Sequence, residues 1–149
     1  MQRRPVVVVH HSQFNMQKIS FSSEKKITAQ QYIALLSQTS LGERRPIEEV
    51  NKIETLLQNS NLLISAWSGD ELVGIARCVT DFAFCCYLSD LAVSDQYQKL
   101  GIGKQLIQYV QTSIEKGCIL ILLAAPQAQG YYPKIGFTQH HSAWIKKSD

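Results

Sequence analysis

The sequence predicts a mixed α/β fold whose sheet contains both antiparallel and parallel strand pairs. Residues 62–67 and 72–79 are strand-like runs joined by the short polar turn at 68–71, which is typical of a β-hairpin. Residues 85–93 and 118–124 are further strand-like runs with a helical pattern between them, and this order implies a parallel pair with a right-handed crossover. With 149 residues, the chain is long enough for one domain with its own core.

Two helices are predicted before the hairpin. Thr28 and Gln31 form a capping-box pattern that opens a helix, and Gly42 ends or follows that helix. Pro46 suits the first turn of a second helix, whose apolar residues recur at helical spacing through 50–57. We therefore expect two helices joined by an exposed polar loop.

The second half of the chain predicts the remaining elements. Residues 103–115 show the spacing of an amphipathic helix, and the 118–124 run, apolar on both faces, predicts a strand buried on both sides. A short helix is expected at 126–135, with closing strands at Phe137 and 143–145. Residues 1–15 show no clear period, so we interpret them as a disordered tail and 16–149 as a single domain.

Composition excludes several functional classes. The net charge is only +3 and the basic residues are scattered, which argues against a nucleic-acid partner. No apolar run approaches the roughly 20 residues that span a bilayer, so we expect a cytoplasmic protein without a membrane partner. The four cysteines form no Cys-x-x-Cys pair and the histidines form no metal-ligand spacing, so reduced thiols and no metal are expected.

A glycine-containing loop is the main functional signal in the sequence. It lies directly between the 85–93 strand and the following helix, and its residues are Gln98, Lys99, Leu100, Gly101, Ile102, Gly103 and Lys104. Glycines let the backbone approach a ligand closely, and the first amides of a helix favour phosphate. The spacing matches neither a P-loop nor a dinucleotide-binding fingerprint. It therefore indicates a pyrophosphate site of another type.

Two motifs together resemble the GNAT superfamily of N-acetyltransferases. Gln98, Gly101 and Gly103 match that family's Gln/Arg-x-x-Gly-x-Gly/Ala pattern, and residues 131–137 (YYPKIGF) resemble its Phe/Tyr-Tyr-x-Lys-x-Gly-Phe element. The resemblance covers residues 61–137 well and residues 28–59 only in outline. It implies a mostly antiparallel sheet whose central parallel strand pair splays around acetyl-CoA, with helices on its flanks. The pantetheine arm would then lie against Leu91, Ala92 and Val93, and the pyrophosphate on the loop 98–104.

The resemblance also suggests the catalytic groups. Tyr132 is expected to donate a proton to the departing CoA sulfur, although a packed aromatic role is the alternative. Relatives often carry a glutamate or histidine at the positions of Tyr87 or Ser89, and this chain has neither. In a regular strand Asp90 would face away from Tyr87 and Ser89, but relatives often have a bulge here that can re-aim a side chain. Asp90, assisted by water, is then the candidate base, with a structural acceptor role equally open. We reject a cysteine nucleophile, because no histidine follows Cys85 and Cys86 at a convincing position.

These features lead to the expectation of an acetyl-CoA-dependent N-acetyltransferase acting on a primary amine, with a small molecule favoured. Phe82, Tyr87 and Trp144 are expected as apolar walls of the acceptor site. Charged residues 43–45 either shape that site or are simply solvated. The alternatives are a non-catalytic CoA-binding regulatory module, a protein lysine or N-terminus acetyltransferase, and an enzyme for longer acyl donors. Homodimers are common on the implied fold.

Overall fold

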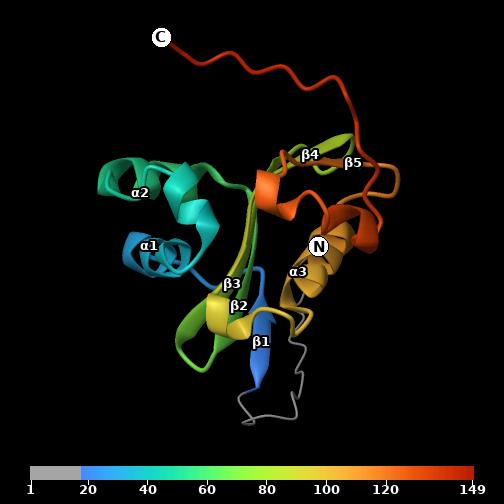
Figure 1. Cartoon of the computed structure of the whole chain (residues 1–149). Coiled ribbons are helices and arrows are strands. Elements are labelled where there is room, and N and C mark those ends of the chain that lie inside the picture. Colours follow the sequence, from blue (N-terminus) through green and yellow to red (C-terminus); the bar gives the residue numbers. More distant parts are fainter. Residues whose placement is uncertain (1–17) are drawn as a thin grey trace.

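The computed structural model describes residues 18–149 and contains one five-stranded sheet (Figure 1). The predicted tail at 1–15 and the expected domain start at residue 16 lie outside the described residues. The strands follow the order of the chain and are β1 (Ile19–Ser22), β2 (Leu62–Ser68), β3 (Glu71–Thr80), β4 (Cys85–Val93) and β5 (Ile119–Ile121). The first four pair antiparallel and β4 pairs parallel with β5, which confirms the predicted mixed sheet.

Helices cover the two faces of the sheet (Figure 1). Helices α1 (Ala29–Ser37) and α2 (Val50–Asn59) lie on one side, and α3 (Ile102–Ser113) lies on the other. Each side has its own apolar core. Tyr32 and Leu36 of α1 and Ile53 of α2 belong to one core, and Leu106 and Val110 of α3 belong to the other. Within residues 18–149 the parallel pair β4–β5 lies at one edge of the sheet rather than at its centre as expected, and α1 reaches this pair through the bond from Tyr32 to Asp90 on β4.

Helix α1 begins where the sequence predicts. The Thr28 hydroxyl accepts from the Gln31 amide at 3.1 Å, and the Gln31 side chain accepts from the Thr28 amide at 3.0 Å. These two bonds satisfy donors that the first helical turn leaves open. The capping box is therefore confirmed, and it fixes the start of the helix that carries Tyr32.

The second helix begins later than predicted. Pro46 lies outside α2, which starts at Val50, and residues 45–49 form tight turns with bonds from the Ile47 amide to the Arg45 carbonyl and from the Glu49 amide to the Pro46 carbonyl. Arg45 is extended, with φ −134° and ψ 149°, as expected for a residue before proline. Pro46 therefore lies in these turns and not in the first turn of α2, so the prediction was wrong.

The C-terminal part departs most from the sequence prediction. Strand β5 is three residues long, and Ile119 and Ile121 are 51% and 49% exposed, so the expected burial on both faces is wrong. The predicted helix at 126–135 is two short 3-10 helices, Pro126–Ala128 and Tyr132–Ile135. The expected closing strands at Phe137 and 143–145 are absent from the described structure: residues 137–149 contain no strand, and Trp144 is 93% exposed. Because residues 138–149 are exposed, no burial of apolar surface would offset the conformational entropy lost if they formed a strand.

Three further expectations concern residues 18–149 as a whole. None of the helices in this range has the length and hydropathy of a bilayer-crossing segment. The same residues contain no cluster of histidine, cysteine and acidic side chains suited to a metal ion. All four cysteines are free thiols, with Cys78 and Cys86 buried and Cys85 exposed.

Candidate active site

Strand β4 has an open edge beside β5. The parallel pairing joins Cys85, Cys86 and Tyr87 to Ile119, Leu120 and Ile121 and then stops, while β4 continues to Val93. Within the described residues, the β5 side of 88–93 therefore has no neighbouring strand. Leu91 and Val93 pack toward the α3 core, and Ala92 packs toward α1. The segment with the three predicted cofactor-contacting residues thus presents unpaired backbone groups.

The loop after β4 ends in a helix start without a side-chain cap. Gly101 is the N-cap of α3 with φ +80°, a left-handed conformation that favours glycine. The first intrahelical bond runs from the Gln105 amide to the Gly101 carbonyl at 3.1 Å. The amides of 102–104 consequently have no acceptor within the helix, and no side chain caps them. This geometry suits an anion such as a pyrophosphate.

The remaining loop residues have distinct positions. Lys99, Leu100 and Lys104 are exposed, and Lys99 adopts a positive φ of 65°. The side-chain amide of Gln98 donates to the Val93 carbonyl and to the Asp95 carboxylate, each at 3.2 Å. Gln98 therefore braces the turn between β4 and the loop, and the charged lysines are left facing solvent.

Tyr131 approaches the same loop from the far end of the chain. A Cβ atom placed on Gly103 would lie 2.9 Å from the Tyr131 hydroxyl and 3.8 Å from a Val93 methyl group. A side chain at position 103 would require the Tyr131 hydroxyl to shift. The contact brings the second sequence motif, 131–137, against the first.

Tyr132 lies between two aromatic rings. Its ring centroid is 5.4 Å from that of Tyr131 and 5.4 Å from that of Phe137, both in edge-to-face geometry. It also packs against the α3 core. Burial, and to a smaller extent Tyr131, raise the pKa of Tyr132 above its ordinary value near 10. The hydroxyl therefore keeps its proton throughout the neutral range, as a proton donor must.

Asp90 lies at the centre of a buried polar network. Its Oδ1 accepts from Arg45 Nε at 2.7 Å, and its Oδ2 accepts from Arg77 Nε and from the Tyr32 hydroxyl, both at 2.6 Å. The Asp90 side chain is fully buried. Burial alone would raise the pKa of Asp90, but the contacts with Arg77, Tyr32 and Arg45 outweigh burial and hold the pKa below its ordinary value. These contacts suit a structural acceptor and disfavour a general base.

A β-bulge explains why Asp90 points into this network. Arg77 pairs with Asp90 and Cys78 pairs with Leu88, so Ser89 is an additional residue on β4. Leu88 consequently packs toward α3, whereas Asp90 reaches Tyr32 on α1. The strand alternation that sequence reasoning uses would have placed Asp90 on the face opposite Tyr87. Arg77 and Tyr32 were not predicted as site residues, since only the folded chain brings them to Asp90.

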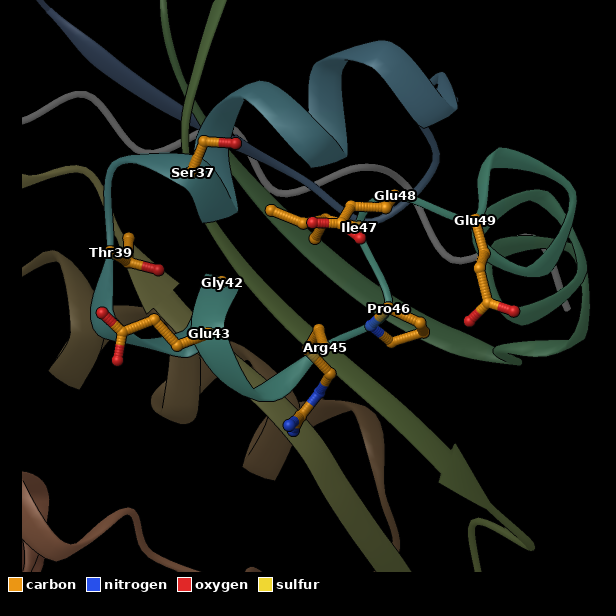
Figure 2. Close-up of a pocket in the computed structure, with 9 residues that line it drawn as sticks. All are labelled: Ser37, Thr39, Gly42, Glu43, Arg45, Pro46, Ile47, Glu48 and Glu49. Atoms are coloured by element: carbon orange, nitrogen blue, oxygen red, sulfur yellow. The ribbon is translucent and has the colours of Figure 1, made fainter.

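A cavity of about 640 Å³ lies along the loop between α1 and α2. Figure 2 shows its lining residues, with the Arg45 side chain directed toward the sheet and the Glu43 and Glu49 carboxylates on opposite sides. Of the expected acceptor walls, Tyr87 is 41% exposed on β4 and Phe82 is 36% exposed in the β3–β4 loop. Trp144 lies in the strandless C-terminal segment, almost fully exposed, so the structure does not place it as a wall.

The open strand edge and the uncapped helix start define an α/β protein whose β4–α3 loop has the geometry of an anion site. The chain belongs to the GNAT acetyltransferase family, since the family model described as an acetyltransferase (GNAT) domain matches residues 25–147. A crystal structure described as a probable acetyltransferase from methicillin-resistant Staphylococcus aureus superposes with a TM-score of 0.68. It covers 87% of this chain and 99% of the other at 20% identity, which shows a shared fold.

Relatives with closer sequences carry N-acetyltransferase names. A protein of Prochlorococcus marinus described as an uncharacterized N-acetyltransferase, ycf52-like, is 36% identical over 101 residues, covering 64% of this chain and 54% of the relative. The histone acetyltransferase TAP1 of Glycine max is 30% identical over 135 residues, covering 82% of this chain and 57% of the relative. The chain thus spans little more than half the length of these curated relatives.

Proposed function

We propose that this protein transfers the acetyl group of acetyl-CoA to a primary amine of a small molecule. One observation carries this proposal: β4 loses its parallel partner after Tyr87 and leads, through a short turn, into a helix whose N-cap is a left-handed glycine. The extended arm that carries the thioester would pair with the open strand edge, and the pyrophosphate would bind at the helix start that follows it. Membership of the acetyltransferase family gives the reaction class.

The residues of the opened strand and loop fit acetyl-CoA. Backbone groups of Leu91, Ala92 and Val93 would hold the pantetheine arm, as an added strand pairs with an open edge. Amides 102–104 and the exposed lysines of the loop would hold the pyrophosphate. When bound, acetyl-CoA supplies an activated thioester. The chain's own task is then to orient it and to provide for proton transfer.

Two proton movements accompany the transfer. The proposed donor to the departing sulfur is Tyr132, whose raised pKa keeps it protonated. The amine must lose a proton, and we assign this step to water rather than to Asp90. Both Asp90 oxygens accept short bonds from arginine, and a carboxylate with a lowered pKa is a weak base.

The cavity beside the network supports an amine acceptor. Three glutamates, Glu43, Glu48 and Glu49, line it together with Arg45. Carboxylates at the mouth of a cavity attract an ammonium ion, which is the form of most amines at neutral pH. Arg45 connects this cavity to β4 through its bond to the Ser89 carbonyl. The acceptor would therefore approach the opened strand from the α1–α2 side.

A protein lysine is the second candidate acceptor. It is favoured by the relative from Glycine max that carries the name histone acetyltransferase and matches 82% of this chain. A lysine side chain offers the same ammonium group to the glutamates. Amine and peptide acceptors can be compared directly in one turnover assay.

Acetyl-CoA is expected to raise the melting temperature of the purified protein. A ligand that binds only the folded state at a hundred times its Kd stabilises it by about 2.7 kcal/mol, or about 5–10 °C at this chain length. CoA should share the effect, and NAD and ATP should not. Release of free CoA is then measured with diamines, amino sugars and lysine peptides. Binding without turnover on any acceptor would favour a non-catalytic CoA-binding module, and no shift at all would contradict the site.

A Gly103→Ala substitution is expected to weaken acetyl-CoA binding more than folding. The new methyl group would lie 2.9 Å from the Tyr131 hydroxyl, the end of a side chain that can shift, and it would stand in the first turn of α3, where the loop backbone is expected to approach the pyrophosphate closely. We expect at least about a tenfold rise in Kd for acetyl-CoA, the cost of losing about one charge-assisted hydrogen bond. Gly130→Ala is the matched control, because a Cβ there meets nothing within 4 Å. Equal Kd values in both variants, measured by calorimetry, would remove the loop from the binding site.

A further inference from the structure

The bulge in β4 creates a backbone group that the sheet does not satisfy. Ser89 is the additional residue between the pairs Arg77–Asp90 and Cys78–Leu88. A bulged residue leaves the regular ladder, so its polar groups need partners elsewhere. In this chain an arginine side chain bonds the Ser89 carbonyl, and a second arginine bonds the Ser89 hydroxyl.

Arg45 and Arg77 hold Ser89 from different elements. Arg45 Nη2, on the α1–α2 loop, donates to the Ser89 carbonyl at 2.6 Å. Arg77 Nη2, on β3, donates to the Ser89 hydroxyl at 2.8 Å. Each guanidinium also donates through its Nε to one oxygen of Asp90. Each arginine therefore forms one hydrogen bond with Ser89 and one with Asp90.

The contact of Arg45 differs from that of an ordinary loop charge. Its side chain is only 21% exposed, and its partner Asp90 is fully buried. Arg45 also donates through Nη1 to the carbonyl of its neighbour Arg44 at 2.8 Å, which fixes the loop around it. A planar guanidinium with several short bonds is far more rigid than a solvated one.

From these contacts we infer that Arg45 is a positioning residue. It holds the loop between α1 and α2, which lines the cavity, against the bulged Ser89 peptide of β4. The peptide unit is planar and trans, so a Ser89 carbonyl held toward Arg45 directs the Asp90 amide the opposite way. The same side chain lines the cavity. Arg45 thus sets the strand backbone and the acceptor cavity relative to each other. Only the expected effect of Arg45 on turnover rests on the proposed function; its effect on the position of the backbone does not.

Arg45→Ala and Arg45→Lys are the variants that test this role. Lysine has one charged nitrogen and cannot bond the Ser89 carbonyl and the Asp90 carboxylate in the fork geometry of arginine. Neither variant should therefore position the bulge. Arg44→Ala is the matched control, because Arg44 is the adjacent exposed arginine, and the substitution removes the same charge from the same loop.

In steady-state kinetics we expect Arg45→Ala to lower kcat/KM for the amine at least about tenfold, as misplacement of reacting groups does. KM for acetyl-CoA should change less than kcat/KM for the amine, because the loop 98–104, which would hold the pyrophosphate, is untouched. Arg45→Lys should behave like Arg45→Ala, and Arg44→Ala like wild type. A lower melting temperature with unchanged kcat/KM per folded enzyme would show a merely structural role and overturn the inference.

Amide hydrogen exchange tests the same positioning role without turnover. Arg45→Ala should exchange faster both in loop 39–49 and at the β4 amides 88–91, whereas Arg44→Ala should match wild type. Faster exchange in the loop alone would overturn the inference, since Arg45 would then not hold the strand. If wild type acetylates no amine, the proposed function fails, and this experiment still decides the role of Arg45.

Discussion

Replacement of Tyr132 by phenylalanine is expected to reduce kcat by about 10²–10³, within the range that a positioned general acid contributes. The substitution removes one hydroxyl and keeps the ring that packs on Tyr131 and Phe137. Folding and acetyl-CoA binding should therefore change little. Pre-steady-state rates of CoA formation should be measured beside kcat, so that slow product release does not hide the chemical step.

Tyr131→Phe is the matched control for this variant. Tyr131 belongs to the same motif and is also partly buried, and its hydroxyl approaches Gly103. Loss of that hydroxyl should affect acetyl-CoA binding and spare the chemical rate. If Tyr132→Phe forms CoA at the wild-type rate, Tyr132 is a packing residue and another group protonates the sulfur.

The pH dependence follows from the direction of the pKa shift. Burial raises the pKa of Tyr132, so its protonated form persists above pH 10. A decrease in kcat caused by Tyr132 should accordingly begin only in strongly alkaline solution. Any limb of the profile below that range belongs to the amine or to another group, and it should remain in Tyr132→Phe.

Local signals in the sequence predicted much of this fold. The Thr28 capping box fixed the start of α1, and the predicted limits of β4 coincide with the observed strand, 85–93. The glycine positions of the loop were also informative, because a left-handed N-cap and a close approach each demand glycine. The capping box and the left-handed N-cap depend on neighbouring residues only, so a single sequence reveals them, whereas the approach of Tyr131 to Gly103 joins distant parts of the chain.

Long-range features were not predictable in the same way. Asp90 was assigned as a base, and its true surroundings come from Tyr32, Arg45 and Arg77, which lie 58, 45 and 13 residues away in the chain. The bulge at Ser89 reverses the alternation of β4; the family resemblance suggested a bulge here, but no residue type at that position signals it. The exposure of β5 likewise depends on which helices reach the sheet edge, which periodicity does not reveal.

The largest stability effect is expected from Asp90→Asn. The asparagine keeps the shape of the side chain but removes the negative charge that balances two arginines, one of them only 9% exposed. Loss of one partner from a buried ion pair costs about 3 kcal/mol or more. The free energy of unfolding, measured in urea, should fall by about this amount. Asp70→Asn, in the exposed β2–β3 turn, removes the same charge and should leave stability unchanged.

The difference between wild type and Asp90→Asn should also depend on pH in one direction. The folded pKa of Asp90 lies below the ordinary value of 3.8, so its stabilisation is complete above about pH 5 and is lost as the pH falls through the folded pKa. The stability gap should thus stay constant from neutral pH to about pH 5 and close only in stronger acid. A gap that closed near neutral pH would mean that Asp90 titrates there, and Asp90 would again be a candidate for the base.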